Sequence, residues 1–118
     1  MSIREIVKIL DAQVLCCEEN LDIVIHSACG SDMMSDVLAY VKNQAALLTG
    51  LVNTQVIRTA MMMDMRCIIF VRGKQPLPEM VDLARNNGII ILATDYPMFE
   101  ACGRLYANQL GNSEVKDV

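Results

Sequence analysis

Short apolar runs alternate with amphipathic segments along the whole chain. The runs are almost continuously apolar and predict strands at residues 13–17, 22–29, 45–51, 66–71 and 89–92. Between them, apolar residues recur at spacings of three and four, which is typical of helices; these segments cover 3–11, 33–41, 54–63, 78–87 and 97–110. Strands without polar alternation suit a sheet that helices cover on both faces. The pattern predicts an α/β fold: a single three-layer domain with a mainly parallel sheet and helices on both faces.

Several helix boundaries have recognisable capping residues. Ser2 and Glu5 have the spacing of a capping box. Pro78 suits the first turn of a helix, because its missing N–H is not needed there. Gly88 suits the position just after that helix. We expect residues 1–118 to form one domain, with residues 112–118 as a frayed polar tail.

The composition excludes several classes of protein. Hydrophobic residues make up 53% of the 118 residues, so the chain can bury enough surface to fold. Ten basic and fourteen acidic residues give a net charge of −4. Because binding to a phosphate backbone needs a basic surface, we expect no nucleic-acid partner. No apolar run approaches the roughly 18–20 residues of a membrane span, so we expect no membrane partner. The N-terminus lacks a signal-peptide pattern, and we expect a cytoplasmic location.

The cysteines and the single histidine form no recognisable metal-binding motif. The five cysteines are Cys16, Cys17, Cys29, Cys67 and Cys102, and no two have Cys-x₂-Cys spacing. We interpret them as small buried hydrophobes. His26 and Cys29 are three apart, and on a strand such residues point to opposite faces. We expect no metal and no cofactor, and we place His26 as a partly buried, hydrogen-bonded residue near a ligand or dimer edge.

The segment 25–38, Ile-His-Ser-Ala-Cys-Gly-Ser-Asp-Met-Met-Ser-Asp-Val-Leu, resembles a signature of small DRTGG-domain proteins. The later strands and the turns at 72–76 and 93–95 follow in the same order, so the resemblance spans roughly residues 10–108. More distantly, the chain is similar to the N-terminal domain of HPr kinase/phosphorylase. The resemblance implies a regulatory or interaction domain, often dimeric, with no established reaction. It also implies a genomic link to iron-only hydrogenases.

Two features depart from the family's pattern. The letters Asp-Arg-Thr-Gly-Gly do not occur, and Arg72-Gly73 stands where the resemblance places paired glycines. No segment matches the phosphate-binding motif Gly-x-x-x-x-Gly-Lys-Ser/Thr. The resemblance therefore reaches the kinase's accessory domain and not its catalytic part.

The first candidate binding turn is Gly30-Ser31-Asp32. A glycine between a strand and a helix start exposes backbone N–H groups that can hold an anion. The Ser31 hydroxyl can add a contact. The Asp32 carboxylate would repel a bare phosphate but could contact a ribose or an amine. The alternative is that Ser31 or Asp32 simply caps the helix, and the two roles can coexist.

Two further turns follow later strands. Arg72 and Gly73 come just after a strand, where ligands gather in open α/β sheets, and the arginine could neutralise a phosphate. The alternative is a solvated turn of little energetic consequence. Thr94 and Asp95 form a second strand-to-helix turn with a capping pattern. We expect it to lie beside Gly30-Ser31-Asp32.

The nine methionines indicate an interaction surface. Met61, Met62, Met63 and Met65 are too closely spaced to face one core, because a helical stripe takes about three of seven positions. Core filling is the alternative interpretation. We expect a homodimer that involves this helix or the helix holding Met33 and Met34.

Three functions compete at this point. We favour a non-catalytic regulatory domain that homodimerises and binds a small anionic metabolite or nucleotide, with a protein partner as a further expectation. The second is a small enzyme or phosphotransfer accessory that uses His26 and Asp32. The third is a scaffold protein linked to hydrogenase assembly, in which the methionines alone matter.

Overall fold

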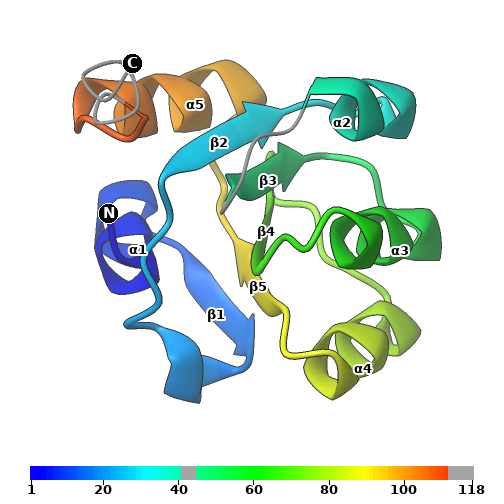
Figure 1. Ribbon diagram of the computed structural model, residues 1–118. Helices are drawn as coiled ribbons and strands as arrows, with labels where there is room; N and C mark the ends of the chain where they lie inside the picture. Colours follow the sequence, from blue (N-terminus) through cyan, green and yellow to red (C-terminus); the bar gives the residue numbers. More distant parts are fainter. Residues whose placement is uncertain (41–44, 112–118) are drawn as a thin grey trace.

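A five-stranded sheet lies between two layers of helices in the computed structural model, which describes residues 1–40 and 45–111 (Figure 1). The strands are β1 (Gln13–Cys16), β2 (Ser27–Gly30), β3 (Ala45–Thr49), β4 (Cys67–Phe70) and β5 (Ile90–Ala93). The helices are α1 (Ile3–Leu10), α2 (Met34–Tyr40), α3 (Thr54–Met62), α4 (Pro78–Asn86) and α5 (Met98–Ala107), with a short 3₁₀ turn η1 (Glu18–Asn20). The predicted tail 112–118 and the predicted end of the second helix at residue 41 lie outside the described residues.

The strand order is β1-β5-β4-β3-β2. Strands β2 to β5 are parallel, and β1 pairs with β5 in the antiparallel sense. In register, Gly30 lies opposite Leu48, Thr49 opposite Phe70, and Phe70 opposite Ala93. The C-terminal ends of the four parallel strands therefore meet at one side of the sheet, which we call the carboxyl edge.

The helices cover both faces of the sheet. Helices α2, α3 and α4 lie side by side on one face, and α1 and α5 pack together on the other (Figure 1). The chain steps across the sheet in one direction from β2 to β5, so right-handed connections place α2, α3 and α4 on the same face. The predicted three-layer α/β architecture with a mainly parallel sheet is confirmed.

The three central strands form the core. Every residue of β3, β4 and β5 is buried, which agrees with their continuously apolar sequences. Phe70 and Ile69 in β4 are fully buried. Burying side chains of this kind contributes about 1.5–3 kcal/mol each. A sheet apolar on both faces is stable only between two helical layers, so the strands dictate the architecture.

The predicted helix boundaries are mostly confirmed. The Ser2 backbone N–H donates to Glu5 Oε1 at 3.0 Å and the Glu5 N–H donates to Ser2 Oγ at 3.2 Å, so the capping box is present. Pro78 occupies the first position of α4, and Gly88 follows its end with φ +68°.

The strand predicted at 22–29 is wrong in its first half. The Ile3 N–H donates to the Ile23 carbonyl at 3.0 Å, the Ile25 N–H donates to the Met1 carbonyl at 2.7 Å, and Ser2 and Val24 form an isolated antiparallel bridge. The β-branched residues are extended as expected, but their backbone groups pair with the start of the chain. Only Ser27–Gly30 joins β3, so β2 is short.

None of the helices in the described ranges has the length and apolarity required to cross a membrane.

Candidate functional site

The carboxyl edge brings together most of the residues that the sequence singled out. The end of β2 contributes Gly30, and the turns after β2, β4 and β5 contribute Ser31, Asp32, Arg72, Gly73, Thr94 and Asp95. The turn after β3 lies between those of β2 and β4 in the strand order. The turns after β2 and β5 share this edge, but the expectation that they lie side by side is wrong, because β3 and β4 and their turns lie between them.

Asp32 joins the turn after β2 to the turn after β3. Its Oδ1 accepts the Gly50 N–H at 2.7 Å and the buried Thr49 hydroxyl at 3.0 Å. The Thr49 hydroxyl in turn accepts the Leu51 N–H at 3.1 Å. Asp32 thus does not cap the following helix, which is one of the two roles predicted for it. Its carboxylate instead orders the backbone of the neighbouring turn.

Ser31 has a local role. Its hydroxyl accepts the Met33 N–H at 3.0 Å, one residue before α2 begins at Met34. This is a serine turn that leads into the helix, close to the predicted capping role. Because α2 spans seven residues, Met34–Tyr40, its dipole is a minor contribution to any anion site here.

Arg72 supplies a positive charge at the carboxyl edge. One guanidinium nitrogen lies 3.8 Å from Asp32 Oδ2, and both side chains are about half exposed, at 50% and 49%. Solvent screening limits such a pair to about 1 kcal/mol or less. The guanidinium therefore remains available to a ligand.

The turn at Arg72 and Gly73 has two consecutive residues in the left-handed region, with φ of +61° and +70°. The Arg72 N–H donates to the Tyr96 carbonyl at 2.9 Å, and the Gly73 N–H donates to the Thr94 carbonyl at 3.0 Å. Glycine adopts this conformation most readily. The geometry supports the interpretation that this pair stands where the resemblance places two glycines, with an arginine in the first position.

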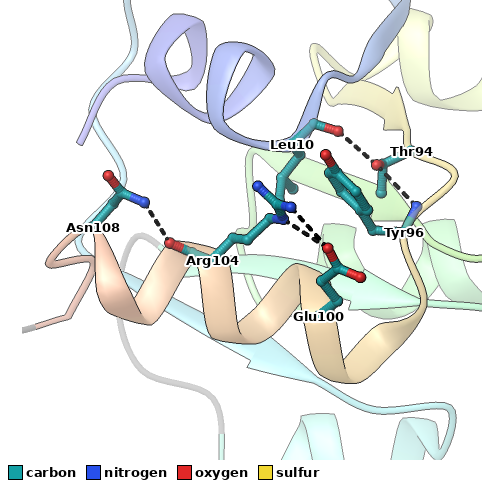
Figure 2. Close-up of polar contacts among 6 residues, drawn as sticks. All are labelled: Leu10, Thr94, Tyr96, Glu100, Arg104 and Asn108. Carbon is teal, nitrogen blue, oxygen red and sulfur yellow. Dashed lines mark hydrogen bonds and ion pairs between the residues drawn. The ribbon is translucent and has the colours of Figure 1, made fainter.

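Thr94 is a structural residue of the site (Figure 2). Its buried hydroxyl donates to the Leu10 carbonyl at 2.7 Å and accepts the Tyr96 N–H at 3.3 Å. This joins the end of α1 to the turn after β5. The predicted capping role is wrong, because α5 begins at Met98 and Pro97 precedes it without a side-chain cap. The hydroxyl hydrogen is used within the fold, so Thr94 positions the turn, and the exposed Asp95 is the residue of that turn that a ligand can reach.

Tyr96 is braced from α5 (Figure 2). The Arg104 guanidinium carbon lies 4.2 Å from the centre of the Tyr96 ring, a cation–π contact. Arg104 also donates to Glu100 Oε2 at 2.8 and 3.0 Å, and this hydrogen bonding raises the pKa of Arg104. Because the Tyr96 carbonyl holds the backbone of Arg72, this contact supports the turn that carries the arginine.

Gly30 is required by packing. A Cβ on this residue would lie 2.7 Å from Cys102 Sγ and 3.2 Å from Met98 Sδ, both in α5. The absence of a side chain lets α5 approach the end of β2. The role of Gly30 as an exposed anion-binding amide stays a prediction.

His26 lies apart from the other predicted residues. It precedes β2, whereas Ser31 and Asp32 follow it, and a four-residue strand spans about 10–13 Å. The side chain is exposed, so the prediction of a partly buried histidine is wrong. Residues 21–25 pair with the N-terminal residues and the sheet strand begins at Ser27, so His26 lies outside the sheet.

The cysteines divide into buried and half-buried groups. Cys16, Cys17 and Cys67 are buried as predicted, while Cys29 and Cys102 are half-buried. Burial raises the pKa of the Cys17 thiol to about 11, with the neighbouring Cys16 adding to the effect. Within residues 1–40 and 45–111, no group of three or more His, Cys, Asp or Glu side chains could hold a metal ion.

The residues that link the turns were not among those predicted from the sequence. Thr49 and Gly50 interrupt the apolar run 45–51, and this interruption was the available signal. Tyr96 contributes its backbone carbonyl, which accepts the Arg72 N–H. A backbone contact of this kind leaves no signal in the sequence.

Comparisons with known proteins agree with this fold. The family described as DRTGG domain matches residues 5–107. A similar solved structure contains the CBS and DRTGG domains of the regulatory region of Clostridium perfringens pyrophosphatase, complexed with its activator diadenosine tetraphosphate. Its TM-score is 0.70 at 17% identity, which shows a shared fold, and the match covers 88% of this chain and 45% of that one. No curated protein sequence matches the chain.

Proposed function

The chain belongs to the DRTGG domain family, and from this premise we propose that it is a non-catalytic regulatory domain that binds a small anionic metabolite or nucleotide at its carboxyl edge and forms a homodimer. The similar pyrophosphatase region is regulatory and was crystallised with a nucleotide activator. This chain spans less than half of that region, so a regulatory role here is inferred from the fold together with the site.

The observation that carries the proposal is the half-exposed Arg72 guanidinium beside the ordered Asp32 carboxylate. Arginine binds phosphate and carboxylate groups through a planar set of N–H donors. The Asp32 carboxylate can accept hydrogen bonds from a ribose or an amine. The two groups together suit a metabolite that combines an anion with hydrogen-bond donors.

Exposed apolar side chains at the same edge favour a nucleotide over an inorganic anion. Met33, Leu77 and Phe99 stand at the starts of α2, α4 and α5, which all begin at the carboxyl edge. Their exposed fractions are 61%, 45% and 91%. An exposed aromatic ring is a suitable stacking partner for a base. Large apolar side chains exposed to water are typical of surfaces that bind a ligand or a partner.

The homodimer is proposed to form through the outer surface of α2 and α3, which are neighbours. Leu38, Met61 and Met62 expose 41%, 40% and 70% of their surface there, while Met65 is buried. The methionine cluster is thus divided between core and surface, as its spacing predicted. Flexible methionine side chains suit an adaptable interface.

Regulation requires the ligand to bind one dimer geometry, or one partner-bound state, better than another. The carboxyl edge is built from turns that lead directly into α2 and α3. A ligand that draws these turns together would therefore change the position of the helices proposed for the interface.

The test is a thermal-shift screen of the purified chain against nucleotides and sugar phosphates, paired with sizing of the wild type and the Met61→Glu/Met62→Glu double variant. We expect a rise in melting temperature that follows the logarithm of ligand concentration, and a dimeric mass that the double variant loses. No thermal shift with any compound, together with an intact dimer, would favour the scaffold function. An unchanged monomeric mass for both proteins would remove the interface.

The phosphotransfer alternative is not supported by a specific contact, because His26 and Asp32 lie beyond opposite ends of β2. Turnover that is abolished by His26→Ala would restore it.

A further inference from the structure

Resting on the proposed function, we infer that Arg72 receives the polyphosphate of a nucleotide, and that the fixed Asp32 carboxylate is its counter-ion until the phosphates replace that carboxylate as the partner of the guanidinium. Gly50, which lies between them, provides the surface on which the guanidinium rests. Three separate features of the carboxyl edge suit this role: a fixed carboxylate, a pre-positioned guanidinium and a weak pairing between them.

The carboxylate is fixed independently of Arg72. Asp32 Oδ1 accepts the Gly50 N–H at 2.7 Å and the Thr49 hydroxyl at 3.0 Å, whereas Oδ2 is the oxygen nearer to Arg72. Loss of the arginine contact leaves both hydrogen bonds intact. The carboxylate therefore stays in place when a ligand approaches, and its negative charge remains part of the site.

The guanidinium is positioned by the absence of a side chain at residue 50. A Cβ on Gly50 would overlap a guanidinium nitrogen of Arg72 and would lie 3.0 Å from its carbon. Gly50 itself is buried, so the arginine covers its backbone. Arg72 keeps a φ of +61°, which a glycine would adopt at lower cost. The chain thus holds an arginine in a strained conformation, and such strain concentrates at functional sites.

The pairing between the two charges is weak. The 3.8 Å separation exceeds hydrogen-bond distance, and both side chains are about half exposed. Among residues 1–40 and 45–111, Asp32 is the one ionic partner of Arg72 within 4 Å. A guanidinium has five N–H donors, and a phosphate can accept two of them in parallel. Exchange of the distant carboxylate for a bidentate phosphate therefore gains hydrogen bonds.

The retained carboxylate also selects among anions. Asp32 and the exposed Asp95 lie at the same edge and repel any anion, so a small anion held by Arg72 alone gains little there. A nucleoside polyphosphate adds further contacts, because its phosphates offer several oxygens to the Arg72 N–H donors and its base can contact apolar side chains such as Phe99, which is 91% exposed. This combination identifies a nucleoside polyphosphate as the ligand class.

The experiment is isothermal titration of the full chain with ATP, with adenosine as the uncharged probe. We expect ATP to bind the wild type and adenosine to bind much more weakly. Arg72→Gly should weaken ATP binding about 10- to 100-fold, the range for loss of charge-assisted hydrogen bonds. The protein should still fold, because glycine suits the left-handed φ. Gly50→Ala should weaken binding about three- to tenfold through displacement of the flexible end of Arg72, the expected scale for a partial loss of those bonds.

Asp32→Asn should change ATP affinity in the opposite direction. Asparagine keeps an oxygen for the Thr49 and Gly50 donors but removes the charge, so ATP should bind about two- to fivefold more tightly. The matched controls are Gly103→Ala, where an added Cβ meets nothing within 4 Å, and Arg85→Gln, which removes a charge from the last turn of α4. Both controls should leave ATP affinity unchanged.

Several outcomes overturn the inference. These are undiminished ATP binding by Arg72→Gly or Gly50→Ala, weaker binding by Asp32→Asn, and no ATP binding by the wild type. The proposed function fails separately, if no compound in the wider screen of nucleotides and sugar phosphates shifts the melting temperature.

Discussion

The Cys102 thiol in α5 lies directly against Gly30, with its sulfur 2.7 Å from where a Cβ would stand. This contact sets how closely α5 approaches the end of β2, next to the turn that holds Asp32. Gly30, which belongs to a candidate binding turn, therefore also has a packing role, and it offers a direct test of the structure.

Gly30→Ala should destabilise the fold by about 1–3 kcal/mol, because the added methyl group overpacks a tight contact. Urea unfolding would measure the change. Gly103→Ala is the control, since its Cβ would meet nothing and the substitution removes a glycine from the interior of α5. It should be neutral or stabilising by about 0.5–1 kcal/mol.

Cys102→Ala should rescue much of the loss in a Gly30→Ala background, because it removes the sulfur atom that the new methyl group meets. Equal destabilisation of the single and double variants would contradict the contact.

Thr94→Val should lower the free energy of unfolding by about 1–3 kcal/mol, because it leaves the buried Leu10 carbonyl and the Tyr96 N–H without their partner. Thr94→Ser, which keeps the hydroxyl, should lose much less. Chemical denaturation of the two variants checks the difference. Similar losses for both would show that the methyl group, and not the hydroxyl, matters at this position.

Glu5 should contribute to the acid sensitivity of the protein. The hydrogen bonds from the Ser2 N–H and hydroxyl hold the pKa of the Glu5 carboxyl below its ordinary value of 4.5. A carboxyl with a lowered folded-state pKa adds stability above its unfolded pKa and loses it as the pH falls through the folded value. Between pH 6 and pH 3, the free energy of unfolding should therefore fall less with decreasing pH in Glu5→Gln than in the wild type. Identical pH profiles would exclude this contribution.

The cysteines should differ in their reaction with a thiol reagent at pH 7.5. Burial raises the pKa of Cys17 to about 11 and raises that of the buried Cys67, so both are neutral thiols in the folded protein. The half-buried Cys29 and Cys102 also have raised pKa values, chiefly from burial, but they are accessible. Mass spectrometry after brief labelling should find Cys29 and Cys102 modified first. Early labelling of Cys67 would contradict its burial.

The secondary structure was largely predictable because its signals are local. The Ser2–Glu5 capping box and Pro78 at the start of α4 depend on side chains within one turn of each other. The strand at 22–29 was mispredicted because β-branched residues favour extended backbone without specifying the partner. Ile23 and Ile25 bond to the start of the chain instead of the sheet.

The site was predictable only in part. Asp32, Arg72 and Asp95 follow parallel strands, and such strand ends must meet at one edge, so their common location could be foreseen. The side-chain contacts could not be foreseen. Asp32 bonds to a turn 18 residues away, and Thr94 bonds to a carbonyl 84 residues away.

Apolar continuity in the strands and the spacing of apolar residues in the helices were enough to establish a layered α/β domain, since covering such a sheet on both faces is the favourable way to remove it from water. Whether a given serine, threonine or aspartate caps a helix, joins two turns or meets a ligand depended on which backbone groups folding brought within about 3 Å of it. Those distances arise between segments remote in sequence, and no local pattern encodes them.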